Sequence, residues 1–264
     1  MDLAAIVVSG IGAGLAAALA LLVVRRPDQN KWLFSAIVFL GMFGFRGLVM
    51  PHVRAWQIDR ETQKALQGLR FYRALKESDP ETYARIQRKV RDGLALGESP
   101  DIVASRVSPI VSEVLPKYLV RTSNGAAVRF LEATNRAISE VDEGSCFALL
   151  LPKKAGGNQR ALQAVKTETQ AELLDAMAEV IETAIQSPQP PPDQVRGEKL
   201  MGQVLERLPT EAASDFQVWN QSEFSAADQR TVCRTGRLLL SQILLLPRDD
   251  GGMLTRHLIG AESQ

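Results

Sequence analysis

The side chains best suited to nucleophilic or metal chemistry are few in this sequence and far apart. There are two histidines, His52 and His257, and two cysteines, Cys146 and Cys233. Metal sites and nucleophile–base pairs place such side chains at short, defined spacings or in recognisable motifs, and no such pattern occurs here. A Cys146–His257 dyad stays open as an enzyme hypothesis, but a structural role for the cysteine is the preferred interpretation. We therefore expect no catalytic site and no metal site.

Three glycines near the start, Gly10, Gly12 and Gly14, are spaced like the beginning of a nucleotide-binding loop. A dinucleotide loop needs the pattern G-x-G-x-x-G and an acidic residue about 20 positions further on, which binds the ribose. Here the third glycine comes one place early, and no Asp or Glu lies between Asp2 and Asp28. The segment therefore predicts no bound nucleotide, and we expect the protein to use no cofactor.

A row of carboxylates in the second half of the chain has helical spacing and could do acid–base work. Its members are Glu168, Glu172, Asp175, Glu179 and Glu182. A solvated, charged helix face is the ordinary explanation of such a row, and we prefer it. A pocket for an anionic ligand is a separate hypothesis, and its first candidates are Arg121, Arg129 and Arg136.

The elements that would position any site begin with a long apolar run, Leu3 to Val24, in which Ser9 is the one strongly polar side chain. At 1.5 Å per residue, its 22 residues span the roughly 30 Å hydrocarbon core of a bilayer. Gly10 and Gly14 within it form a small-residue face on which another helix can pack closely. We interpret residues 3–24 as a transmembrane helix. A cleaved signal peptide is not favoured, because an aspartate rather than a basic residue precedes the run.

A second apolar stretch, residues 32–50, follows after a short connection and contains a single charge, Arg46. Trp32 and Trp56 flank it like interfacial anchors, and an arginine near a helix end can extend to the headgroups. The stretch has its own small-residue stripe, formed by Gly41, Gly44 and Gly47. We expect residues 1–51 to form a transmembrane hairpin. The alternative is that only the part before Arg46 is apolar, which is too short to span a bilayer.

The charges beside the first apolar run predict its orientation. Arg25, Arg26 and Lys31 follow the run closely, and basic residues stay on the cytoplasmic side, so the N-terminus should face outward. With a hairpin, residues 52–264 lie outside the inner membrane of a bacterium, in the periplasm; without it, they lie in the cytosol. The two cysteines fit one disulfide in an oxidising compartment, although two independent buried thiols fit the sequence as well.

Composition and periodicity predict that residues 52–264 form an all-α multi-helix bundle. Apolar residues recur at three-four spacing, and almost no segment alternates in the manner of a strand. The sequence has 31 basic and 30 acidic residues, and no basic stripe with interleaved aromatic residues stands out. Nucleic acid is therefore not an expected partner.

Capping and stop signals divide this part of the chain into helices. The expected helices are 55–76, 78–97, 99–119 with a break or kink at Pro109, 124–144, 159–186, 194–208, 212–219, one from Ser225 through the LLLSQILLLP run, and 253–259. The helix from Ser225 has a start like a capping box, and its apolar end should be buried on nearly all sides. Residues 146–152 form a short buried segment and 153–157 a loop. A proline-rich connector, 187–193, is expected to join two helices of one domain.

These expectations lead to two hypotheses of function. The first is a membrane-anchored helical interaction or assembly protein of the bacterial cell envelope, without catalysis. Its partners are the lipid bilayer and either another envelope protein or a second copy of the chain. The second is an envelope enzyme or anionic-ligand sensor whose site is built from scattered residues of the helical domain.

Overall fold

The computed structural model describes residues 60, 62–63 and 66–261. The chain divides into two units, Met1–Glu61 and Thr62–Gln264, and the elements described below all belong to the second. Within the described residues there are helices, turns and connecting segments but no strand, which confirms the predicted all-α class.

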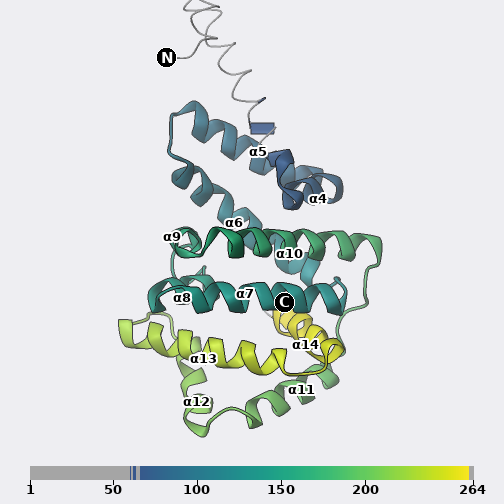
Figure 1. Ribbon diagram of the computed structural model, residues 1–264, viewed down its shortest axis with the longest axis vertical. Coiled ribbons are helices and arrows are strands. Elements are labelled where there is room, and N and C mark those ends of the chain that lie inside the picture. Colours follow the sequence, from purple (N-terminus) through teal and green to yellow (C-terminus); the bar gives the residue numbers. More distant parts are fainter. Residues whose placement is uncertain (1–59, 61, 64–65, 262–264) are drawn as a thin grey trace, which may run out of the picture. The chain divides into compact units, whose positions relative to one another are not determined.

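The second unit is a bundle of short and medium-length helices (Figure 1). In chain order they are α4 (Arg70–Ser78), α5 (Pro80–Ala95), α6 (Pro100–Leu119), α7 (Asn124–Glu140), α8 (Glu143–Leu150), α9 (Gln159–Ala164), α10 (Thr167–Gln186), α11 (Gln194–Glu206), α12 (Thr210–Asp215), the 3₁₀ helix η2 (Phe216–Asn220), α13 (Ala226–Leu244) and α14 (Arg248–Ala261).

Side-chain caps start many of these helices where the sequence predicts them. The Asp79 carboxylate accepts from the Thr82 amide to begin α5, and the Ser123 hydroxyl accepts from the Ala126 amide to begin α7. At the start of α13, the Ser225 side chain and the side chain three residues later form the reciprocal bonds of a capping box. Each cap satisfies an amide that has no partner inside its helix.

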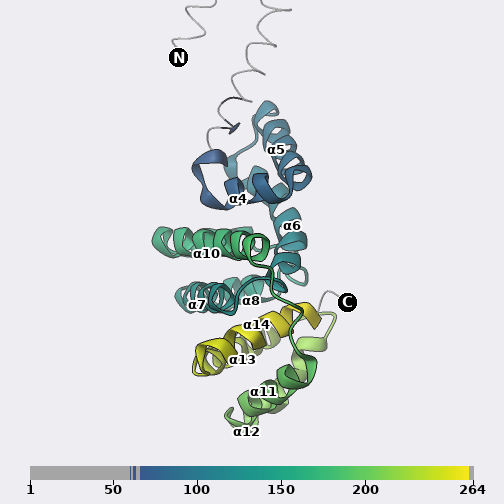
Figure 2. The same ribbon diagram turned by 90° about the vertical axis from the view of Figure 1, so that its right-hand side faces the viewer.

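The helix α7 lies at the centre of the bundle. It packs against α10 on one side and against α13 and α14 on the other, and Figure 2 shows these helices as successive layers. α6 runs across the edges of the layers and contacts α5, α9, α10 and α14. One apolar cluster fills the space among α4, α5, α6 and α10, and a second joins α7 to α11, α13 and α14.

Two expected boundaries inside the bundle are wrong. α6 continues through Pro109, so the break that was one of the two expected outcomes there is absent; apolar residues on both sides of the proline pack into the core and outweigh one lost backbone bond. The expected helix over 159–186 is instead two helices, since the chain is extended at Val165 and Lys166. The Gln170 side-chain amide donates to the carbonyls of Leu162 and Val165, both at 2.8 Å, and so satisfies the C-terminal end of α9.

Smaller differences concern the ends of three other helices. The expected helix 55–76 is interrupted at Leu69, which has extended backbone angles and precedes α4. The expected helix 124–144 ends at Glu140, and α8 begins after a new cap at Asp142. At the other end of the chain, α14 starts five residues before the predicted 253, at Arg248. The apolar end of α13 is not buried on all sides, because Leu245 is 69% exposed.

No helix among the described residues is both long and apolar enough to cross a membrane. The predicted hairpin, with helices 3–24 and 32–50, lies outside the described residues. The connector 187–193 is non-helical, as expected, and joins α10 to α11 within the second unit.

Candidate functional site

A cleft of about 800 Å³ opens between α6, α8 and the loop that leads to α9. Its lining combines serine hydroxyls from α6 and α8 with glycine backbone and basic side chains from the loop. The lining residues are Ser105, Ser108, Pro109, Ser112, Glu113, Asp142, Gly144, Ser145, Ala148, Pro152, Lys153, Ala155, Gly156, Gly157, Asn158, Arg160 and Ala161. We define these residues as the α6–α8 cleft.

The α6 wall of the cleft is a stripe of serines. Ser105, Ser108 and Ser112 follow one another at three- and four-residue steps, which places their hydroxyls on one face of the helix. The Ser108 hydroxyl donates to the Asn158 side-chain oxygen at 2.7 Å and thereby ties α6 to the loop. This spacing was visible in the sequence, but nothing in the sequence showed that the stripe faces a hollow.

The α8 wall is held by the cap at Asp142. Its carboxylate accepts from the Ser145 amide at 3.0 Å and from the Ser145 hydroxyl at 2.7 Å. These two hydrogen bonds stabilise the ionised carboxylate and lower the pKa of Asp142 below its ordinary value. The N-terminal amides of α8 therefore already have an anion beside them, and an anionic ligand must bind elsewhere in the cleft.

The loop between α8 and α9, together with the start of α9, supplies the positive charge of the cleft, from Lys153 and Arg160. Gly156 and Gly157 have φ values of 74° and 125°, so only glycine fits this reversal without strain. The Lys154 ammonium donates to the carbonyls of Trp219 and Gln221, at 2.5 and 3.0 Å, and fixes the loop on the C-terminal end of η2.

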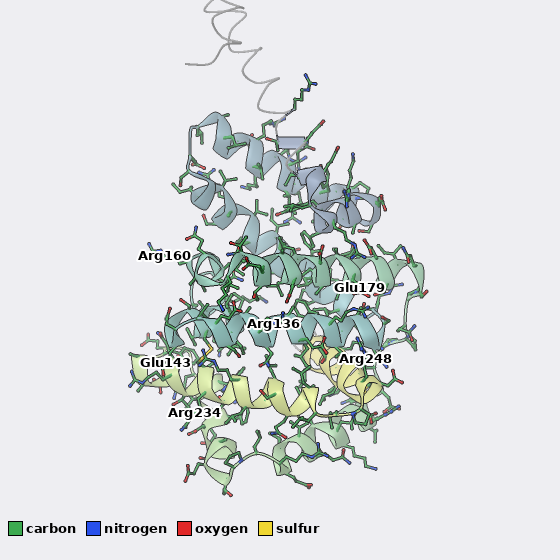
Figure 3. The ribbon with its side chains drawn as sticks, viewed as in Figure 1. Arg136, Glu143, Arg160, Glu179, Arg234 and Arg248 are labelled. Carbon is green, nitrogen blue, oxygen red and sulfur yellow. A yellow bond between two sulfur atoms is a disulfide. The ribbon has the colours of Figure 1, made fainter. Side chains whose placement is uncertain are left out.

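Two cations of the cleft remain available for a ligand. Lys153 and Arg160 are exposed, and neither has an acidic partner within 4.0 Å among the described residues. Figure 3 shows Arg160 at the α9 end of the bundle. The acidic side chain at the far rim, Glu113, already lies 3.3 Å from Arg85 and 3.6 Å from Lys117. The cleft therefore suits a carboxylate or phosphate that also accepts from serine hydroxyls.

The structure brings the two cysteines together. The sulfur atoms of Cys146 in α8 and Cys233 in α13 are 2.03 Å apart, which is a disulfide distance, and the two residues are 0% and 1% exposed. This confirms the interpretation of a bonded pair over that of two independent thiols. It also overturns the Cys146–His257 dyad, because a sulfur in a disulfide is no nucleophile. His257 instead lies against α11, where a Cβ on Gly197 would be 2.5 Å from its ring.

The arginine pocket expected from Arg121, Arg129 and Arg136 is not formed. Arg129 and Arg136 lie along α7, and each pairs with a different glutamate of α10. Arg136 is 2.5 Å from Glu172. Arg129, seven residues earlier in α7, pairs with Glu179, seven residues later in α10, because the two helices run antiparallel. Figure 3 labels one member of each pair, Arg136 and Glu179, on these neighbouring helices.

The row of carboxylates on α10 is correspondingly more than a solvated face. Three of its five expected members form ion pairs, with Glu182 reaching Arg70 of α4 at 2.5 Å. The pairs are partly exposed, so each contributes roughly 0–1 kcal/mol, and they align α10 with its neighbours more than they stabilise the fold. Within the described residues, no three metal-ligating side chains come together.

The predicted membrane residues fall outside the described residues. They are Gly10, Gly14, Gly41, Gly44 and Gly47 on the two helix faces, and Arg25, Arg26, Lys31, Trp32, Arg46 and Trp56 at the boundaries. His52 lies outside them as well.

No protein-family model, curated protein or solved structure matches this chain.

Proposed function

We propose that the chain is a membrane-anchored helical interaction module of the bacterial cell envelope, whose helical domain lies in the periplasm. The observation that carries this proposal is the buried pair Cys146–Cys233, which links helices 87 residues apart in sequence. Disulfides of this kind persist in oxidising compartments and are rare in the cytosol. The location agrees with the hairpin topology that the apolar segments and their flanking charges predict.

The α6–α8 cleft is the proposed docking site for an acidic segment of a partner protein. Lys153 and Arg160 offer charge without an internal partner, and the serine stripe offers hydroxyls along one wall. The two cations of the cleft are exposed to solvent, which suits a chain segment better than a small substrate that must be shielded from water. Among its lining residues there is no histidine or cysteine to serve as base or nucleophile.

Topology mapping tests the location. Reporters that are active only in the periplasm or only in the cytosol are fused after Arg60 and after Gln264. The proposal expects periplasmic activity at both points, and protection of both cysteines from alkylation until a reductant is added. Cytosolic activity at both points, with thiols that react under denaturing conditions without a reductant, would contradict it.

Photo-cross-linking tests the docking site. A photoreactive residue at Ser112, inside the cleft, should give an adduct of discrete mass in intact cells, and the same residue at Ser241, exposed on α13, should not. The adduct should disappear when Lys153 and Arg160 are changed to glutamate, because the charge that attracts the partner is reversed. Equal adducts from both positions would show that the cleft has no special role.

A sensor of a small anion is a second candidate function, favoured by the same two cations. It predicts that inorganic phosphate or a dicarboxylate raises the melting temperature of the purified chain in detergent, because a ligand bound to the folded state stabilises it. The K153Q/R160Q variant should lose that shift. An R248Q variant, which removes an exposed arginine of α14, should keep it.

A further inference from the structure

Exposed apolar side chains gather at the turn between α5 and α6. Leu94, Leu96 and Ile102 are 37%, 71% and 48% exposed, and we call residues 94–102 the α5–α6 tip. Three large exposed apolar side chains so close in sequence differ from the scattered single ones that are normal on a protein surface.

The backbone of the tip turns these side chains outward. A Cβ on Gly93 would be 2.7 Å from Val103, so α5 and α6 approach closely at the base of the tip. Beyond that contact Gly97 has a φ of 71°, in the left-handed region. The chain therefore turns away from the helical path of α5 directly after Leu96, which lies at the turn. The exposure is thus a consequence of a packed hairpin and not of a loose loop.

Basic side chains surround the tip on the α5 side. Arg88 and Lys89 are exposed and have no ion pair among the described residues, and Arg91 lies 3.5 Å from its neighbour Asp92. On the α6 side Glu98 is paired with Arg106. Exposed apolar side chains with unpaired cations on the preceding helix are a combination that favours contact with anionic bilayers.

The tip also lies at the end of the second unit where its described chain begins. Figures 1 and 2 place α4, α5 and the start of α6 at one end and α11 and α12 at the other. By sequence, the second apolar run ends at Met50 and the second unit starts at Thr62. The intervening 51–61 segment extends at most about 40 Å, at roughly 3.5 Å per residue.

We propose that the α5–α6 tip docks on an anionic lipid surface, with Leu96 and its apolar neighbours in the headgroup region and Arg88 and Lys89 beside the phosphates. This inference depends on the membrane anchoring proposed above and adds a second contact with the bilayer. Lipid is favoured over a protein partner because Arg88 and Lys89 are unpaired, and because the part of the chain that precedes the second unit contains the two apolar runs predicted to enter the bilayer.

A fluorescent probe on the full chain tests this contact. Leu96→Cys is labelled with an environment-sensitive dye and compared with Leu245→Cys, a leucine of similar exposure (69%) that follows α13. The native cysteines are buried at disulfide distance and should not label, which the unsubstituted chain controls. Both labelled chains are reconstituted into vesicles of phosphatidylcholine with or without phosphatidylglycerol, and into the same vesicles containing brominated lipid.

The proposal expects a blue-shifted emission at position 96, with quenching by brominated lipid that requires phosphatidylglycerol, and neither effect at position 245. In an R88Q/K89Q background the docking equilibrium should fall roughly 30-fold, because each near-surface cation contributes a factor of about 5.

Chains that float with the vesicles but give the same signal at both positions would overturn the lipid contact alone. Chains that do not float would overturn the anchoring and the contact together. A blue shift without quenching by lipid would assign the tip to a protein contact and overturn the proposal.

Discussion

Arg256 is a buried cation without a carboxylate partner among the described residues. It is 4% exposed, and burial lowers the pKa of its guanidinium. Its Nε and Nη2 donate to the Val120 carbonyl at 3.1 and 2.8 Å, Nη1 donates to Asn124 Oδ1 at 3.0 Å, and Nη2 also donates to the Pro190 carbonyl. Val120 is the C-cap of α6, so the charge meets the negative end of that helix.

Arg237 repeats this arrangement one layer away. Its guanidinium donates to the carbonyls of Ile138 and Val141, at 2.6 and 2.8 Å, at the C-terminal end of α7. The planar guanidinium presents five N–H donors in a fixed fork, so it can reach several carbonyls at once in a defined geometry. Two arginines on the last two helices therefore satisfy the C-terminal ends of two earlier helices, across 136 residues of sequence for Arg256 and 99 for Arg237.

We expect Arg256→Met to lower the free energy of unfolding by about 2 kcal/mol, because it removes the buried guanidinium that donates to the Val120 and Pro190 carbonyls and to Asn124 Oδ1. Urea unfolding of the chain in detergent, followed by circular dichroism, measures the change. Arg248→Met removes an exposed arginine of the same helix and should change stability by less than about 0.5 kcal/mol. Equal midpoints for the two variants would show that Arg256 is not an essential contact.

A pH-dependent prediction concerns the cap at Asp142. The pKa of Asp142 is lower in the folded state than in the unfolded chain, so the unfolded chain takes up the proton at a higher pH. The free energy of unfolding therefore falls as the pH decreases from the ordinary aspartate pKa toward the lower pKa of the folded state. Asn at this position keeps the cap but cannot titrate. Asp142→Asn should therefore flatten the decline of the melting temperature below about pH 5, where an aspartate begins to titrate.

The control for this prediction is Glu132→Gln on the exposed face of α7. It removes one carboxylate without removing a cap, so the acid-side decline should match that of the unsubstituted chain. If the two variants give the same profile, the cap at Asp142 does not contribute to the pH dependence.

At the scale of elements, the close approach of α14 to α7 depends on one glycine. A Cβ at Gly252 would overlap the backbone of Asn124, the first residue of α7, and backbone cannot rotate away as a side chain can. Gly252→Ala should therefore separate the two helices and lower the melting temperature by several degrees, as a loss of about 2 kcal/mol does in a domain of this size.

Gly202→Ala in α11 is the matched comparison. Nothing lies within 4 Å of the position its Cβ would take, so the change should stabilise the helix by up to about 1 kcal/mol. The two substitutions add the same methyl group inside a helix and are expected to act in opposite directions. A melting temperature that rises for both would mean that α14 and α7 tolerate a wider separation.

The sequence predicted elements well where the signal was local. The caps at Asp79 and Ser225 and the proline-rich connector depend on residues that are neighbours in the chain. Boundaries set by distant contacts were missed: the end of α9 depends on the Gln170 side chain, and the continuity of α6 through Pro109 depends on packing. The α6–α8 cleft belongs to this second kind, because its walls come from helices whose contact no local pattern encodes.

At the scale of the whole molecule, the cysteine pair joins parts that the chain separates. Cys146 lies in α8 beside the α6–α8 cleft, and Cys233 lies in α13, 87 residues later. A cross-link over a loop of this length restricts the unfolded chain strongly, and in the chain-entropy account it contributes about 4 to 5 kcal/mol. Sequence alone left open whether the two thiols meet, since proximity between distant segments appears only in the fold.

We therefore expect the C146A/C233A variant to unfold at a clearly lower urea concentration than the unsubstituted chain, by about 4 to 5 kcal/mol in free energy of unfolding. Adding a reductant to the unsubstituted chain should give a similar loss, and adding it to the variant should change nothing. Because the same bond helps hold α8 against α13, and α8 forms one wall of the cleft, the variant should also weaken cross-linking from Ser112. If stability falls while cross-linking from Ser112 is unchanged, the disulfide supports the fold but not the proposed docking site. If neither the stability nor the cross-linking changes, the chain carries free thiols, and the periplasmic location loses its main support.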